Sequence, residues 1–167
     1  FGGCDRDALV RVFREDLKLA HQYEAEYVVF HVSQASIEET FTWRYRHTDE
    51  EVIDASSEIL NEVFADEDGS IILLLENLWQ PGLTFTSPEN TRRLLEKINY
   101  PNTGLMLDTG HLMHTDTNLA SEEEALCYIH QRLDEHEGLM KKIRGVHLHQ
   151  SLTGVYSEAV TADPPVM

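Results

Sequence analysis

The sequence alternates short apolar runs with longer amphipathic segments, and this alternation restricts the fold more than any other feature. Four runs are apolar at odd and even positions alike and are too short for helices; they cover residues 27–32, 71–77, 104–108 and 143–149. Runs of this kind are typical of strands that are buried on both faces. We therefore expect four strands, each separated from the next by a helical segment.

Helical segments precede and separate the four runs. Apolar residues recur at three- and four-residue intervals over residues 7–26, as on the buried stripe of an amphipathic helix. Three later segments carry start signals, either a capping box or a hydroxyl before a proline, at Thr48, Ser87 and Ser121. Residues 33–47 and the tail after residue 151 show no clear period and are predicted as loop.

This order of elements predicts an α/β fold with parallel strands and right-handed crossovers. Two architectures fit, an open doubly wound sheet or part of a (β/α)8 barrel. No Gly-rich phosphate loop of the G-x-G-x-x-G type follows any strand, which disfavours a nucleotide-binding open sheet.

Composition restricts the class of protein and its partners. The 167 residues, 41% of them hydrophobic, are enough for one globular domain over 1–167. With 30 acidic against 13 basic residues the net charge is −17, so nucleic acid and anionic membranes are disfavoured as partners. No apolar stretch is long enough to span a bilayer, and the opening residues lack a targeting pattern. Cys4 and Cys127 make no disulfide framework, so a cytoplasmic protein is expected.

Each apolar run ends in ionisable side chains, which are His31, Glu76, Asp108, and the pair His147 and His149. A carboxylate buried beside such a run costs several kcal/mol unless it is paired or bound to a cation. Because parallel strands end on the same side of a sheet, these groups are expected on one rim, where α/β enzymes place their sites. Two carboxylates with imidazoles suit a divalent ion, Zn²⁺ or Mn²⁺ first, with Mg²⁺ or Co²⁺ open. The alternative is that the carboxylates only cap helices and that the histidines are ordinary interior residues.

The stretch Asp-Thr-Gly-His at 108–111 adds a further candidate. Gly110 would permit a tight turn, so His111 could fold back over the rim as a second-metal ligand or a substrate contact, unless it is an ordinary loop residue. Asn77 is placed to orient Glu76 or a loop. The remaining histidines that lie on helix or loop patterns are predicted at the surface, and these are His21, His47, His130 and His136.

Taken in chain order, four motifs resemble those of the xylose isomerase-like TIM barrel superfamily. They are Val-Val-Phe-His at 28–31, Leu-Leu-Glu-Asn at 74–77, Leu-Asp-Thr-Gly-His at 107–111 and Gly-Val-His-Leu-His at 145–149. The resemblance implies a (β/α)8 barrel in which Glu76, Asp108 and His147 are metal ligands. A fourth ligand, a Glu at the end of the last barrel strand, is not in this chain. His31 and His111, with His149, would contact substrate or a second metal.

The resemblance also implies an activity. We expect a divalent-metal-dependent sugar or sugar-phosphate isomerase or epimerase that removes a proton next to a carbonyl and forms a metal-stabilised enediolate, with Glu76 as ligand and base. A small carbohydrate is then the partner. An endonuclease IV-like phosphodiesterase and a non-catalytic barrel are the alternatives. A complete barrel needs about eight strands and about 250 residues, so four strands predict either an incomplete barrel or a barrel whose flanking residues are missing from this sequence. A homo-oligomer is also possible.

Overall fold

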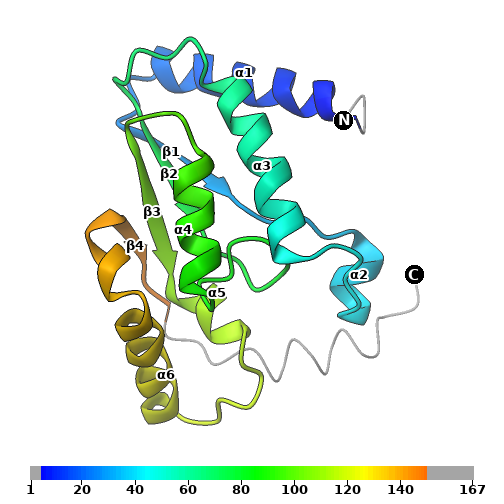
Figure 1. The fold of residues 1–167 in the computed structure, drawn as a ribbon, viewed down its shortest axis with the longest axis vertical. Helices are drawn as coiled ribbons and strands as arrows, with labels where there is room; N and C mark the ends of the chain where they lie inside the picture. Colours follow the sequence, from blue (N-terminus) through cyan, green and yellow to red (C-terminus); the bar gives the residue numbers. More distant parts are fainter. Residues whose placement is uncertain (1–4, 150–167) are drawn as a thin grey trace.

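The computed structural model describes residues 5–149 and contains a four-stranded sheet (Figure 1). The strands are β1 (Tyr27–His31), β2 (Ile72–Glu76), β3 (Thr103–Asp108) and β4 (Ile143–His147). They are hydrogen-bonded in chain order, and all three neighbouring pairs are parallel. The prediction of four parallel strands is therefore confirmed, with each boundary within two residues of the expected one.

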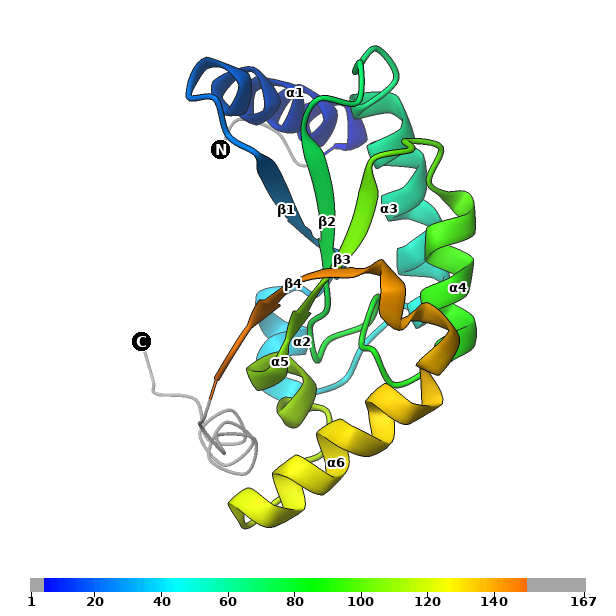
Figure 2. The same cartoon turned by 90° about the vertical axis from the view of Figure 1, so that its left-hand side faces the viewer.

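Helices connect the strands and cover one face of the sheet. They are α1 (Arg6–Gln22), α2 (Ile37–Thr42), α3 (Asp49–Val63), α4 (Pro88–Lys97), α5 (Thr109–His114), α6 (Glu122–Glu135) and the 3-10 helix η1 (Glu137–Lys142). Figures 1 and 2 show α3 and α4 side by side on the same face, with α1 across one end and α6 beyond β4. Helices on the outer face of a parallel sheet are the arrangement of a (β/α)8 barrel.

The expected start signals do begin helices. Thr48 and Glu51 form a reciprocal capping box at α3, and Ser87 caps α4 ahead of a proline. Ser121 caps α6 as predicted, but the carboxylate of Glu124 accepts from the N–H of Ala120, 2.7 Å away, so that box is not reciprocal.

The prediction of loop over residues 33–47 is wrong for α2. Ser36 and Glu39 form a reciprocal capping box there, and the Glu39 carboxylate also accepts from the N–H of Arg46 at 2.8 Å. The hydrogen bonds from Ser36 and Arg46 lower the pKa of Glu39 to about 2. A six-residue helix has too few turns to show an apolar period, so its capping box was the only local signal.

The core lies between the sheet and the helices. Leu73, Leu75 and Leu105 point toward the helices and join one buried cluster with Ile53 of α3 and Leu94 of α4. The intervening side chains point to the opposite face, where Leu74 and Met106 are also buried, at 3% and 4% exposure. This explains why the strands are apolar at both parities.

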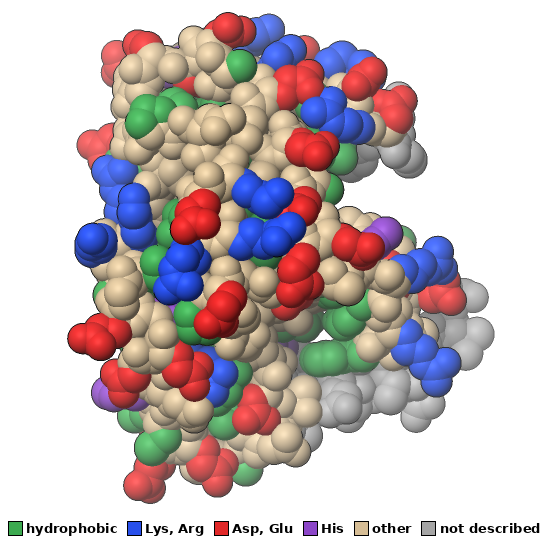
Figure 3. Space-filling model, in the orientation of Figure 1, with side chains coloured by type: hydrophobic (Ala, Val, Ile, Leu, Met, Phe, Trp, Pro, Cys, Tyr) green, Lys and Arg blue, Asp and Glu red, His purple; other side chains and the backbone are tan. Residues whose placement is uncertain are grey.

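Charged side chains cover the outer surface of the helices (Figure 3). Arg93 and Lys97 of α4 pair with Asp54 of α3, at 2.6 and 3.1 Å. The Arg93 guanidinium beside Asp54 is the main reason that the pKa of this carboxyl falls to about 2. None of the described helices has the length and apolarity needed to cross a lipid bilayer.

Within the described residues the sheet has two free edges, β1 and β4. Apolar side chains stay exposed near them: Tyr27 at 48%, Val146 at 54% and Leu148 at 76%. A closed eight-stranded barrel has no edges and would cover such side chains. The described sheet is thus an incomplete barrel.

Candidate metal centre

The candidate site lies where the strands end. His31, Glu76, Asp108 and His147 are the last residues of β1, β2, β3 and β4. The strand register pairs His31 with Glu76, and Asp108 with His147. The structure therefore brings these four predicted residues to one rim of the sheet.

Glu76 is at the centre of the cluster. Its Oε1 is 3.2 Å from Nδ1 of His147, 3.3 Å from Nε2 of His31 and 3.4 Å from Nδ1 of His111. The Glu76 side chain is only 2% exposed, whereas the rings of His31 and His147 are 56% and 43% exposed. The carboxylate thus forms the floor of the site and the imidazoles line its mouth.

Asp108 is the second buried carboxylate, with 3% of its side chain exposed. Its Oδ1 accepts a hydrogen bond from the backbone N–H of His111 at 2.8 Å. Its Oδ2 faces two imidazoles, with Nε2 of His149 at 3.3 Å and Nδ1 of His147 at 3.7 Å. Oδ1 therefore caps a helix and Oδ2 faces the cluster. Helix capping accounts for the position of Oδ1 but not for that of Oδ2.

His111 reaches the rim by a different route from the predicted one. Asp108 is the N-cap of α5, so His111 returns on the first turn of this short helix and not through a tight turn at Gly110. Gly110 has no positive φ, but a Cβ there would be 2.9 Å from Cβ of His149. Glycine is needed at 110 because another chain segment passes close by.

The ring of His111 is held in one orientation. Its Nδ1 is 2.8 Å from the carbonyl oxygen of Asn77, which can only accept, so Nδ1 carries the proton and Nε2 of the neutral ring is left as the donor atom for an ion. The ring of Trp79 packs against those of His111 and His114, with centroids 5.3 and 5.0 Å apart.

His149 is held by Thr109, the first residue of α5. Oγ1 of Thr109 accepts from the N–H of His149 at 2.8 Å and lies 3.3 Å from the carbonyl oxygens of His147 and His149, to one of which it donates. The sequence motif contained this threonine, but only the strand pairing reveals its role.

His136 does not lie at the surface, so that prediction is wrong. It is 1% exposed, its ring stacks on Phe85 with centroids 3.9 Å apart, and Nε2 is 3.0 Å from Oγ1 of Thr91. The helical pattern could not show this burial, because Phe85 and Thr91 come from an earlier part of the chain. The other three, His21, His47 and His130, are exposed as predicted.

The donor set fits a divalent cation. Ligand atoms from Glu76, Asp108 and His147 lie within 4.8 Å of one another, and so do those from His31, Glu76 and His111. Oε2 of Glu76 is buried and has no hydrogen-bond partner among the described residues. A buried carboxylate oxygen without a partner is costly, and a cation bound by carboxylates and imidazoles would satisfy it.

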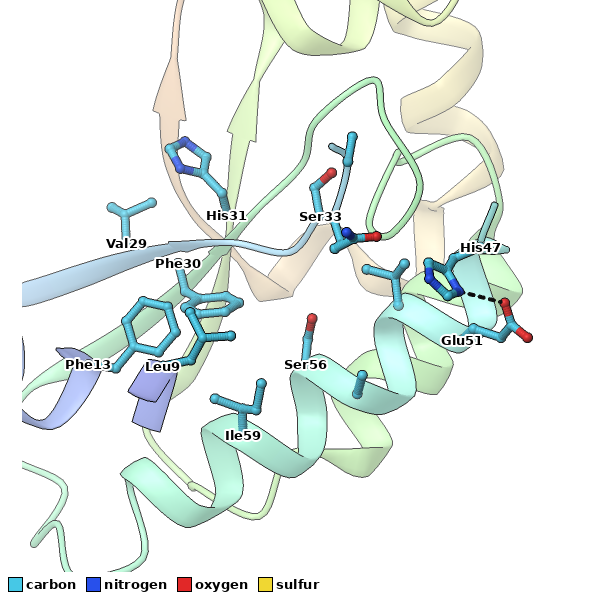
Figure 4. A pocket seen from close by; sticks show the side chains of 14 residues that line it. Leu9, Phe13, Val29, Phe30, His31, Ser33, His47, Glu51, Ser56 and Ile59 are labelled. Atoms are coloured by element: carbon cyan, nitrogen blue, oxygen red, sulfur yellow. Dashed lines mark ion pairs between the residues drawn. The ribbon is translucent and has the colours of Figure 1, made fainter. Parts of the chain in front are cut away.

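A separate groove of about 850 Å³ lies beside the free edge of β1, between α1 and α3 (Figure 4). Phe13, Phe30 and Ile59 form its apolar wall, and of the cluster only His31 lines it. In Figure 4 the His31 ring lies on the other side of β1 from the Phe30 ring. The groove and the carboxylate cluster are therefore distinct.

Comparison with known proteins identifies the fold and the family of the chain. A crystal structure of a D-tagatose 3-epimerase-like protein has the same fold, with a TM-score of 0.58 and 22% identity over 87% of this chain. The chain spans 49% of that protein. No curated protein matches the sequence significantly. The sequence profile of the family described as xylose isomerase-like TIM barrel matches residues 3–161. The chain therefore belongs to the xylose isomerase-like TIM barrel family.

Proposed function

We propose that this chain forms the metal-binding part of a divalent-metal-dependent sugar isomerase or epimerase. The family and the epimerase-like structural neighbour support this reaction class. One observation supports the metal dependence: Oε2 of Glu76 is buried and has no hydrogen-bond partner among the described residues, although ligand atoms of Asp108 and His147 lie close to this carboxylate.

Glu76, Asp108 and His147 would hold the ion, with Zn²⁺ or Mn²⁺ expected first. When bound, the ion would supply positive charge that stabilises the oxygen of a sugar carbonyl as a neighbouring proton is lost. Glu76 is also the candidate base, because its carboxylate lies at the centre of the cluster, within 3.4 Å of the rings of His31, His111 and His147.

The histidines at the mouth would bind substrate hydroxyls. The rings of His31 and His149 are each 56% exposed, so both can reach a ligand that enters from the rim. The partly buried Trp79 beside His111 adds an apolar wall, as is usual in small-molecule sites.

Metal stoichiometry tests the proposal. The purified chain should bind a divalent ion, and Glu76→Ala and Asp108→Ala should each lose most of it. Asp54→Ala is the matched control, since it removes a carboxylate that is paired with Arg93 on the helical surface. Unchanged metal content in both cluster variants would refute the site.

Proton exchange tests the reaction. The metal-loaded protein should exchange the hydrogen next to the carbonyl of a ketose or aldose with deuterium from solvent, which NMR detects directly. Free and phosphorylated sugars are assayed in parallel. A chain that binds metal but exchanges no sugar proton would favour a non-catalytic barrel.

The second group of candidate ligands, His31, Glu76 and His111, fits an alternative function, that of a phosphodiesterase with more than one metal ion. His31 and His111 share Glu76 with the first group, so the cluster offers side chains that would hold a second ion. Two or three Zn²⁺ per chain together with phosphodiester cleavage would indicate an endonuclease IV-like enzyme. The net charge of −17 disfavours a nucleic-acid substrate.

A further inference from the structure

Asn77 is a fully buried polar residue that immediately follows Glu76, and its side chain crosses from β2 to β3. Its exposure is 0%. Oδ1 accepts from the backbone N–H of Asp108 at 2.9 Å, and Nδ2 donates to the backbone carbonyl of the same residue at 3.1 Å. Only one orientation of the amide satisfies both bonds, because the flipped side chain would face donor with donor and acceptor with acceptor.

These two bonds extend the sheet where the backbone pairing stops. The register between β2 and β3 ends at Glu76 and Met106, two residues before Asp108. The Asn77 side chain is an amide like the peptide group, so it supplies the donor and the acceptor that a further ladder pair would have provided. The Asp108 backbone is thereby fixed at the point where its carboxylate leaves the strand.

The same asparagine acts on a second member of the cluster through its main chain. Its carbonyl oxygen fixes the His111 ring with the proton on Nδ1. The N–H of His111 in turn bonds to Oδ1 of Asp108. Asn77 is therefore bonded to two cluster residues and covalently joined to a third, Glu76.

We propose that Asn77 is the positioning residue of the metal centre, and that its side chain sets the direction of the Asp108 carboxylate toward the ion. This inference rests on the proposed metal site. Asn77 is too deeply buried to touch substrate, so its side chain would affect the ion through Asp108, which it holds, and not by direct contact. Partners that orient metal ligands typically change metal affinity by about 10- to 100-fold when they are removed.

The chain contains a matched control. The half-buried Asn61 makes a similar pair of bonds between α3 and the end of α4, where Nδ2 donates to the carbonyl of Lys97 at 2.8 Å and Oδ1 accepts from the N–H of Asn99 at 2.8 Å. Asn61→Ala thus removes a two-bond side-chain bridge outside the cluster, and it reports the structural cost of losing such a bridge.

The experiment measures Zn²⁺ and Co²⁺ affinity by competition titration, with the visible spectrum of bound Co²⁺ as a second readout. Asn77→Ala, and Asn77→Leu as a volume-filling variant, should bind about 10- to 100-fold more weakly than wild type and change the Co²⁺ spectrum. Asn61→Ala should do neither. Equal affinity and spectra in wild type and a folded Asn77 variant would overturn the inference.

Hydrogen exchange keeps the inference testable if both Asn77 variants fail to fold. In the wild-type chain the Asp108 amide should exchange slowly, because Asn77 accepts its hydrogen. Fast exchange of this amide in folded wild-type protein would overturn the positioning role. If the wild-type chain binds no ion but its Asp108 amide exchanges slowly, the proposed function is refuted. The structural role of Asn77 in holding Asp108 would still stand.

Discussion

Glu76 and His147 lie on strands separated by β3, yet Oε1 of Glu76 is 3.2 Å from Nδ1 of His147. Strands two positions apart are about 9.5 Å apart in a flat sheet. The inner face shows the same closeness between β2 and β4, because a Cβ added at Gly145 would lie 3.6 Å from Cδ1 of Leu74. The sheet is thus curved toward the site, as in a barrel, and this curvature brings side chains of alternate strands together.

The first prediction is that Gly145 permits this curvature. A Cβ at 145 would come within 2.7 Å of Cε of Met106, so Ala could be accommodated by the flexible end of that side chain, but Val could not. We expect Gly145→Val to lower the free energy of unfolding by about 1–3 kcal/mol, the usual cost of overpacking. Gly138→Val is the control, since no atom lies within 4 Å of its added Cβ. Equal losses in urea denaturation would contradict the prediction.

The second prediction concerns the cost of the buried carboxylate. Oε2 of Glu76 has no partner among the described residues, so the metal-free protein should be destabilised by this group. Glu76→Met keeps the length and removes the charge, and the facing imidazoles of His31 and His147 are exposed enough to hydrate. We expect the metal-free variant to gain about 0.5–2 kcal/mol in the free energy of unfolding.

Asp54→Asn provides the contrast to that gain. Its carboxylate is bonded by Arg93 and Lys97, so its neutralisation should lower stability. A loss of stability in metal-free Glu76→Met, measured by thermal unfolding with a chelator present, would count against the proposed destabilisation at Glu76.

The third prediction separates two glycines with positive φ. Gly82 has φ of 134°, and a Cβ there would meet the carbonyl oxygen of Val32 at 2.1 Å, whereas Gly69 has φ of 89° and open space around it. The N–H of Gly82 also bonds to Asp49, so this loop cannot move away freely. Gly82→Ala should cost about 3 kcal/mol or more, and Gly69→Ala about 1–2 kcal/mol. Similar losses for the two variants would show that the Gly82 loop can move to accommodate a side chain.

Local patterns were sufficient for most of the fold. The runs that are apolar at both parities identified the strands, because a parallel sheet is covered on both faces. Thr48 and Ser87 marked helix starts, because their hydroxyls accept hydrogen bonds from backbone N–H groups of the first turn. The clustering of Glu76, Asp108 and His147 followed from topology alone, since parallel strands end on one side.

Other features depended on contacts between distant segments. The sequence placed Asn77 next to Glu76 but could not show that its amide pairs with Asp108, 31 residues away. Gly110 was assigned to a tight turn, although its real constraint is the approach of His149. Neither interaction produces a periodic pattern in the neighbouring sequence, so only the structure could reveal them.

The last prediction is a pH dependence of stability that arises from His136. Burial lowers the pKa of His136 below its ordinary value near 6.5, and this outweighs the opposing contributions of the hydrogen bond to the Arg132 carbonyl and of the Glu135 carboxylate. Because the folded state disfavours the protonated ring, His136 contributes stability that is present above pH 6.5 and is lost as pH falls through the lowered pKa. The wild-type advantage over His136→Gln in the free energy of unfolding should therefore shrink from pH 8 to pH 5. His130→Gln, at an exposed position of α6, the helix that His136 caps, should follow the wild-type profile. A constant difference between wild type and His136→Gln across this range would mean that protonation of His136 does not oppose folding.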